Sequence, residues 1–257
     1  GKWRHGGDLE AAAGQSLSDV TAVRSLASLM PVHRASTCHY GCLPEDIETG
    51  GMDAVCPECA RKYGEGLSLT HIEPAHLIEL PQNPSFEDIF GQAEDPNFPS
   101  NNLPTKRSLL SQADQNFLFI KDINLVNQNI TRTILNAAST GVYNIRRGTL
   151  STSYKSRISV IASMDPQAGL LNPELLSQFG LRVLVKGLDS EAQRIEAYQR
   201  AVAFQKNPSA FVGQFFEATE TARKEVQAAR DRLPSVEIPE KIMRQAVHLL
   251  QAQKVAS

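Results

Sequence analysis

Short apolar runs that alternate with helical segments constrain the fold of this 257-residue chain more than any other feature. The runs FLFI at 117–120 and ISVIAS at 158–163 are too short for buried helices. A short run without a polar face is typical of a parallel strand that is covered on both sides. RVLVK at 182–186 is interpreted as a third such strand. Strands that alternate with helices predict an α/β fold with a three-layer, mainly parallel sheet.

Helical periodicity is visible on both sides of these runs. Residues 17–30 carry apolar side chains at three- and four-residue spacing, and Pro31 ends the pattern. Asn207 followed by Pro208 is a typical helix start. The helices expected later in the chain lie at 124–140, 189–206 and 207–232, and a last one begins near Pro239.

Fewer helices and strands are expected between the helix at 17–30 and about residue 105. Residues 77–80 form a candidate strand between prolines. Residues 32–75 read as loop-rich, and 81–105 hold several prolines and should be mostly loop.

The charge balance excludes several classes of function. The chain has 26 basic and 28 acidic residues, for a net charge of -2, which gives no basis for nucleic-acid or membrane-surface binding. No apolar run reaches the roughly 18 residues needed to span a bilayer. The first residues also lack the apolar core of a signal peptide. A soluble protein inside the cell is therefore expected.

The four cysteines are clustered with the spacing C-x3-C-x13-C-x2-C. They are Cys38, Cys42, Cys56 and Cys59. Two close pairs separated by a loop can supply four thiolates in a tetrahedron, which predicts a structural zinc site. An iron–sulfur cluster and a pair of disulfides are the alternatives. A catalytic metal is disfavoured, because four protein ligands leave no open coordination position.

Three segments in the same order resemble the ATPase core of the magnesium chelatase I subunit, a ring-forming AAA+ protein. They are TAVRSLASLMP at 21–31, FLFIKDINLVN at 117–127 and MDPQAGLLNPELLSQFGL at 164–181. The resemblance implies a P-loop NTPase-like fold. It also implies positions for a phosphate loop, for acidic Mg²⁺ ligands and for residues that act on the γ-phosphate.

The phosphate loop implied by the resemblance is AGQSLSDV, residues 13–20. Its last glycine corresponds to Ser18, its lysine to Asp19 and its Mg²⁺-binding hydroxyl to Val20. A carboxylate in place of the lysine repels phosphates. Gly14 and Thr21 are the residues that could partly substitute in nucleotide binding.

The other implied catalytic positions are also changed. The acidic pair after the strand at 117–120 is replaced by Lys121 and Asp122, and we expect Lys121 to form a salt bridge with Asp19. The asparagine that senses the γ-phosphate is replaced by Asp165, and the arginine finger by Gln178. Packing and turn residues remain while charged chemistry is lost, which indicates a retained fold with an abandoned reaction.

The family resemblance also implies a division of the chain. The AAA+ core would occupy residues 1–232, with a Cys-rich insertion at about 32–75 and a hairpin insertion at about 141–160. Residues 233–257 would begin a C-terminal helical lid. Arg146 and Arg147 in the hairpin are equally compatible with solvated charges and with contact to a ring neighbour.

These features predict a degenerate AAA+ module, comparable to the chelatase D subunit, that assists an active paralogue in a homo- or hetero-oligomeric ring. The process implied by the resemblance is ATP-driven metal insertion into a tetrapyrrole, in the cytoplasm or the plastid stroma. A working ATPase with an atypical site remains an alternative, supported by Thr21, Asp122 and Asn124. A zinc-stabilised interaction platform is another.

Overall fold

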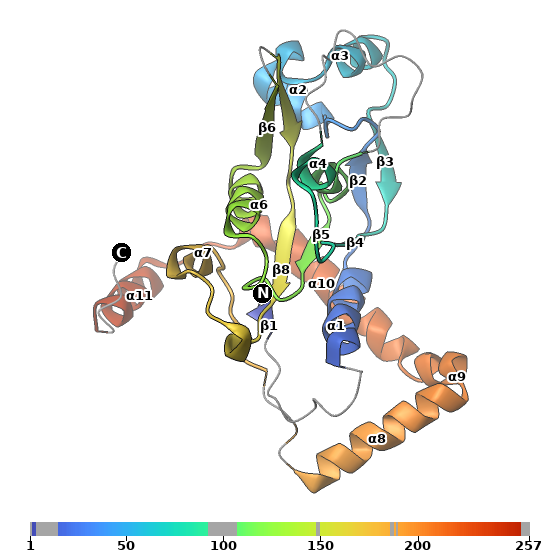
Figure 1. Ribbon diagram of the computed structural model, residues 1–257. Helices are drawn as coiled ribbons and strands as arrows, with labels where there is room; N and C mark the ends of the chain where they lie inside the picture. The colour runs from blue at the N-terminus through green and yellow to red at the C-terminus, as the bar shows by residue number, and fades with distance from the viewer. Residues whose placement is uncertain are drawn as a thin grey trace.

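A four-stranded parallel sheet lies at the centre of the molecule (Figure 1). The computed structural model describes residues 2–3, 15–91, 107–147, 150–185, 188 and 190–252. The sheet order is β1–β8–β5–β4. Its strands are β1 (Lys2–Trp3), β8 (Ser159–Ser163), β5 (Phe117–Ile120) and β4 (Leu77–Glu79). Three of the strands predicted from the sequence, at 77–80, 117–120 and 158–163, are thereby confirmed.

Helices cover both faces of the sheet, as the apolar runs predicted. On one face Phe119 packs with Ile161 and with Val23 of α1 (Gln15–Leu29). On the other face Leu118 and Ile120 join a larger core that includes Ile134 of α6 (Gln128–Thr140). Successive strand residues point to opposite faces, so β5 serves both layers. The three-layer α/β fold is confirmed.

The prediction of a strand at 182–186 is wrong for the residues that the structure describes. Residues 181–185 have no regular structure, and Lys186 lies outside the described residues. Both edges of β8 are already used, one by β5 and one by β1. A strand needs a neighbour for its backbone N–H and C=O groups, and in the described part of the chain residues 181–185 pair with none.

Helix α6 begins four residues later than the sequence analysis expected. Asn127 is its N-cap, and its side chain accepts a hydrogen bond from the backbone N–H of Asn129 at 2.9 Å. The preceding residues form a turn, in which Asp122 has a φ of 47°. This turn redirects the chain from the end of β5 onto the face of the sheet.

The segment expected to be loop-rich contains regular elements. It holds an antiparallel strand pair, β2 (His33–Ser36) and β3 (Thr70–Glu73), and between them the helices α2 (Pro44–Gly50) and α3 (Pro57–Gly64), with a 3-10 turn at Met52–Ala54. Short helices α4 (Phe86–Phe90) and α5 (Leu109–Gln112) follow. The loop expectation was wrong here because tertiary pairing stabilises elements that are too short to be recognised locally.

Residues after α6 form a β-hairpin of β6 (Val142–Arg147) and β7 (Leu150–Lys155). Tyr143, Ile145, Thr152 and Tyr154 on its inner face are buried, whereas Asn144 and Arg146 on the outer face are exposed. The chain then leads directly into β8. Figure 1 shows the hairpin extending from the sheet towards α2, at the end of the molecule that holds the cysteines.

Residues 190–252 are mainly helical. Helix α8 (Glu191–Lys206) and α11 (Glu240–Ala252) project from the sheet, while α10 (Phe216–Arg232) runs back along α1 (Figure 1). The helix expected at 207–232 is divided into α9 (Pro208–Gly213) and α10, and its predicted cap Asn207 is confirmed. The remaining elements are α7 (Pro173–Ser177) and 3-10 turns at Pro166–Ala168 and Leu233–Ser235. The division at residue 232 stays a prediction.

Candidate functional site

The structure brings the four cysteines together at one end of the molecule. Cys38 and Cys42 flank the turn between β2 and α2, Cys56 is the N-cap of α3, and Cys59 lies within α3. All four Sγ atoms lie within 4.8 Å of one another. Cysteine thiolates in such an arrangement match the donor set of a tetrahedral metal site. The cluster could therefore hold a metal ion, as the spacing predicted.

Backbone and hydroxyl donors point at the sulfur atoms. The Cys42 N–H lies 3.4 Å from the Cys38 Sγ, and the Cys56 N–H lies 3.3 Å from the Cys42 Sγ. The Ser36 hydroxyl donates to the Cys38 Sγ at 3.4 Å. Hydrogen bonds to a sulfur that bears negative charge stabilise the thiolate and hold it in place.

The close approach of the thiols changes their proton affinities. Hydrogen bonds from Cys42, and then from Cys56 and Cys59, lower the pKa of Cys38. The same interaction with Cys38, together with burial, raises the pKa of Cys42. One thiolate forms easily, but further negative charges at this spacing repel one another. A bound cation would remove that repulsion and allow all four sulfurs to be thiolates.

The cluster supplies much of the apolar interior of its own segment. Apart from the cysteines, Ile47 and Leu69 are the buried apolar side chains of this small core, with Tyr40 and Val55 partly buried against it. Two fully buried aliphatic residues give only about 3–6 kcal/mol of hydrophobic stabilisation. A metal ion bound by the four sulfurs would add to the stability that this small core provides.

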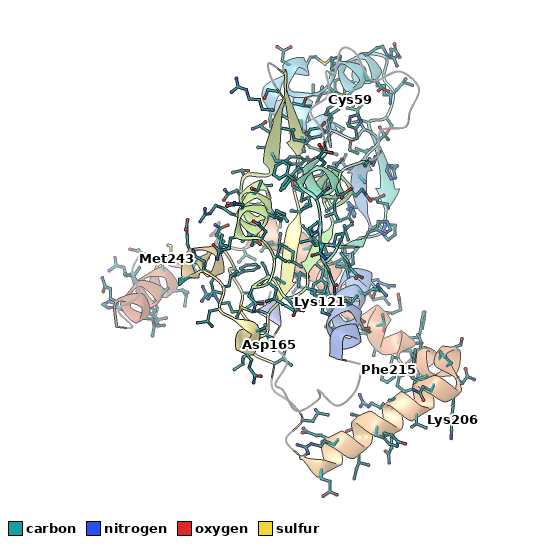
Figure 2. All side chains as sticks on the ribbon, viewed as in Figure 1. Cys59, Lys121, Asp165, Lys206, Phe215 and Met243 are labelled. Carbon is teal, nitrogen blue, oxygen red and sulfur yellow. The ribbon has the colours of Figure 1, made fainter. Side chains whose placement is uncertain are left out.

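Lys121 and Asp165, two of the positions implied for nucleotide chemistry, lie away from the cysteine cluster, at the other end of the sheet (Figure 2). Lys121 follows the last residue of β5, and its Nζ atom is 3.9 Å from the Asp122 Oδ2. The expected salt bridge between Lys121 and Asp19 stays a prediction, because the Asp19 side chain lies outside the described part of the structure.

Asn124, which is one of these positions, is hydrogen-bonded to the segment that contains Asp165. Its side-chain amide donates to the backbone carbonyl of Asp165 at 3.0 Å and to that of Gly169 at 2.9 Å. The Asp165 carboxylate accepts the backbone N–H of Gln167 at 2.8 Å and caps a 3-10 turn. The amide of Asn124 and one oxygen of Asp165 are thus engaged in holding this end of the sheet together.

The remaining predicted positions are either packed in the core, exposed or outside the described residues. Val20, which stands where the Mg²⁺-binding hydroxyl is expected, packs against the apolar cluster of Val23 and Phe119. Thr21 and Gln178 are exposed. Gly14 and the Ser18 side chain lie outside what the structure describes. A nucleotide role for these residues stays a prediction.

Replacing Asn124 by Ala is expected to lower the free energy of unfolding by about 1–3 kcal/mol, because two hydrogen bonds of about 0.5–1.5 kcal/mol each are lost. Urea unfolding followed by circular dichroism measures this change. Asn129→Ala on the exposed surface of α6 is the matched control and should stay within about 0.5 kcal/mol. Equal effects of the two substitutions would show that Asn124 has no special role.

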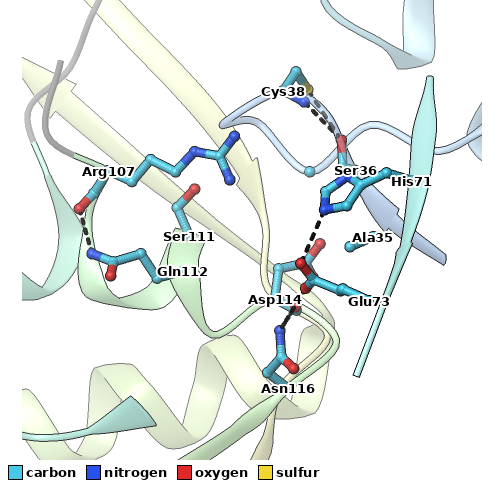
Figure 3. A pocket seen from close by; sticks show the side chains of 11 residues that line it. Ala35, Ser36, Cys38, His71, Glu73, Arg107, Ser111, Gln112, Asp114 and Asn116 are labelled. Carbon is cyan, nitrogen blue, oxygen red and sulfur yellow. Dashed lines mark hydrogen bonds and ion pairs between the residues drawn. The ribbon is translucent and has the colours of Figure 1, made fainter. Parts of the chain in front are cut away.

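A small polar pocket of about 40 Å³ borders the cysteine cluster (Figure 3). Its wall includes Cys38, Arg107 and the carboxylate of Glu73, which accepts a hydrogen bond from His71 at 3.0 Å. Asp114 also lines this pocket and is 8% exposed, and it was not predicted as a site residue from the sequence. An acidic residue beside an apolar strand was its only local signal.

Comparison with known proteins identifies relatives of this chain. No protein-family model matches the chain. A magnesium-chelatase 38 kDa subunit of Acidiphilium rubrum is 32% identical over 231 residues, which are 89% of this chain and 66% of that protein. A magnesium-chelatase subunit ChlI homolog of Methanocaldococcus jannaschii is 29% identical over 225 residues, 87% of this chain and 60% of that protein.

A solved structure extends the likeness to the fold. It is a complex between subunits BchI and BchD of magnesium chelatase based on a single-particle cryo-EM reconstruction. The match has a TM-score of 0.54 and 26% identity, and it covers 93% of this chain and 70% of that chain.

The parallel sheet, its helical layers and this structural match define an AAA+ module of the P-loop NTPase-like fold. More narrowly, the chain is a homologue of the magnesium-chelatase 38 kDa, or ChlI, subunits. It spans 66% and 60% of the two relatives' lengths, in both cases less than two thirds. Within the described ranges, no helix combines the length and the apolar character that crossing a membrane requires.

Proposed function

We propose that this protein is a chelatase-type AAA+ module that does not hydrolyse ATP and serves as a ring or scaffold subunit beside an active paralogue. The observation that carries the proposal is Lys121 at the carboxyl end of β5, where the resemblance implies a carboxylate for Mg²⁺. The Lys121 ammonium lies 3.9 Å from the Asp122 carboxylate. A cation in this position opposes Mg²⁺ binding and neutralises part of the acidic charge that remains.

Two further features support the loss of hydrolysis. The Asn124 amide donates to two backbone carbonyls, so binding a phosphate would require it to leave them. Val20 offers a methyl group instead of a hydroxyl and packs into the core. Both features support the proposal that these residues have lost a role in nucleotide chemistry.

The proposed partner is an AAA+ paralogue with an intact site, and the proposed process is ATP-driven metal insertion into a tetrapyrrole. Support comes from the structural relative, which is a complex of two chelatase subunits. The exposed Arg146 on the outer face of the hairpin is a candidate for the contact with a neighbour. Compartment and ring size stay predictions.

For the four-cysteine cluster we propose a structural Zn²⁺. Cys38, Cys42, Cys56 and Cys59 would hold it, and four thiolates complete its preferred tetrahedron. When bound, the ion contributes charge neutralisation and cross-linking rather than Lewis-acid chemistry. A zinc-stabilised interaction platform that does not enter a ring is the second candidate function, and this cluster is the observation that favours it.

Calorimetric titration of the zinc-loaded protein with Mg·ATP tests the loss of nucleotide binding. We expect no heat of binding up to millimolar nucleotide, because Asp19 in the implied phosphate loop repels phosphates and Lys121 repels Mg²⁺. The Acidiphilium rubrum 38 kDa subunit, titrated in parallel, is the positive control. Micromolar binding to this protein would overturn the proposal and favour an active ATPase with an atypical site.

Co-purification with that 38 kDa subunit then separates the two remaining functions. Recovery of a mixed oligomer in the presence of Mg·ATP, reduced by Arg146→Glu, is expected for a ring subunit. Arg132→Glu on α6 provides a charge-matched control away from the hairpin. A protein that stays monomeric in every condition would contradict the ring proposal and leave the interaction platform.

A further inference from the structure

The loop between the first two cysteines, Cys38-His39-Tyr40-Gly41-Cys42, packs directly against the base of the β6–β7 hairpin. The backbone carbonyls of the three residues between the cysteines all accept hydrogen bonds, from α5 at His39 and from the hairpin base at Tyr40 and Gly41. The His39 carbonyl accepts the Ser111 hydroxyl, the Tyr40 carbonyl accepts the Lys155 N–H at 3.0 Å, and the Gly41 carbonyl accepts the Arg157 guanidinium. We call this five-residue loop the first knuckle. Its shape depends on where Cys38 and Cys42 are held.

Gly41 allows this close approach. It has a φ of 76°, and an added Cβ would lie 2.8 Å from an Asp114 carboxylate oxygen and 2.9 Å from the Lys155 Cβ. Glycine is therefore required both by the left-handed backbone and by the lack of space. The first knuckle and the hairpin base are in direct steric contact.

An ion-pair network surrounds this contact. The Arg157 guanidinium lies 2.9 Å from the Asp114 Oδ2, and the Asp114 side chain is only 7% exposed. Asp46, in the first turn of α2, reaches the Lys155 Nζ at 3.2 Å and Arg157 at 3.7 Å. The same Asp46 carboxylate accepts the Leu43 N–H at 2.8 Å. The network thus connects the helix that follows Cys42 to the hairpin.

Aromatic rings continue the connection into the hairpin itself. Tyr40 stacks on Tyr154 with 5.2 Å between ring centroids, and Tyr154 stacks on Tyr143 at 5.1 Å. The Tyr143 hydroxyl is 2.7 Å from the Ser108 Oγ. Tyr40 packs against both the cysteine-containing core and the main core, so it joins the two. Stacked pairs of this kind add about 0.5–1.5 kcal/mol beyond burial.

We propose that metal occupancy of the four-cysteine cluster sets the order and direction of the β6–β7 hairpin through the first knuckle. The inference rests on the metal binding proposed above. A bound ion fixes Cys38 and Cys42 relative to Cys56 and Cys59, and the knuckle carries that constraint to Tyr154, Lys155 and Arg157. The cluster then acts as a metal-dependent control on the element that presents Arg146.

Hydrogen exchange of the full chain, read by mass spectrometry, tests the coupling. Zinc-loaded and chelator-stripped protein are compared under reducing conditions. We expect the amides of β6 and β7 to exchange about tenfold more slowly in the zinc-loaded protein, whereas β5 and α6 change little. Unchanged hairpin exchange, with one zinc per chain confirmed by elemental analysis, would overturn the coupling alone. Failure to retain zinc would overturn the metal proposal as well.

A second comparison stays informative if stripping unfolds the chain. In zinc-loaded Arg157→Ala, all four cysteines remain, so zinc content should be unchanged while hairpin exchange accelerates severalfold. Arg132→Ala is the matched control, because Arg132 pairs with Glu174 at 3.4 Å, away from the knuckle. Equal hairpin exchange in both variants would contradict the proposed route.

Discussion

Replacing Cys59 by Ser is expected to remove the metal from the four-cysteine cluster and to unfold residues 33–73. Cys59 is fully buried, and its sulfur lies within 4.8 Å of the other three. A structural zinc site contributes about 10–16 kcal/mol of apparent binding free energy, and that energy is folding energy when no site exists in the unfolded chain. The small core of Ile47 and Leu69 cannot replace it.

Zinc content by elemental analysis and the thermal unfolding of the protein measure this effect. We expect one zinc per chain in the parent protein and none in Cys59→Ser, with an early unfolding transition confined to the segment. Thr49→Ser on the surface of α2 is the control, because it preserves the hydroxyl and every cysteine. One zinc per chain retained by Cys59→Ser, with an unchanged transition, would contradict a four-thiolate site.

Acidification should act in the same direction as this substitution. Zinc binding requires thiolates, so protons compete with the ion as the pH falls. The lowered pKa of Cys38 keeps one thiolate available, whereas the raised pKa of Cys42 makes its thiolate depend most on the bound cation. Zinc release on acidification is therefore part of the same expected result.

Replacing Phe119 by Ala is expected to destabilise the sheet and loosen α1. Phe119 is 1% exposed at the centre of β5, and it packs with Val23 of α1 and Ile161 of β8. Truncating a buried phenylalanine removes apolar contact and leaves a cavity, at a cost of about 3–5 kcal/mol. Because Phe119 points to the α1 face, we expect hydrogen exchange to increase first in that helix.

Urea unfolding and hydrogen exchange check this prediction together. Leu125→Ala is the control, since Leu125 is 66% exposed in the turn after β5 and should change stability by less than about 0.5 kcal/mol. A Phe119→Leu variant, which retains most of the apolar volume, should recover part of the loss. A cost below about 1 kcal/mol for Phe119→Ala would mean that α1 is not anchored through this residue.

The apolar runs illustrate how far local pattern could predict the fold. FLFI and ISVIAS form β5 and β8, whose side chains are buried by helices on both faces. A continuous apolar run is the local signal for a strand buried in this way. RVLVK has a similar composition but forms no strand in the described residues. The difference is that β5 and β8 pair with neighbouring strands, whereas residues 181–185 pair with none in the described part of the chain.

The candidate sites divide in the same way. Cysteine spacing predicted the four-cysteine cluster, because two short pairs can converge without help from distant residues. The ion-pair network around the first knuckle was not predicted, since Arg157 and Gly41 are 116 positions apart in the chain. The role of Asn124 as a tie between two loops was equally invisible, because nothing near it marks Asp165 and Gly169 as its acceptors.

The sequence by itself determined the α/β class, the main sheet strands and helices, and the clustering of the four cysteines of this chelatase-I homologue. These follow from periodicity, capping residues and close cysteine pairs, which act over a few residues. Only the tertiary structure decided the β2–β3 pairing, the absence of a strand at 181–185 and the contact between the first knuckle and the hairpin. Those features depend on which distant backbone edges and charges meet, and local sequence does not specify that.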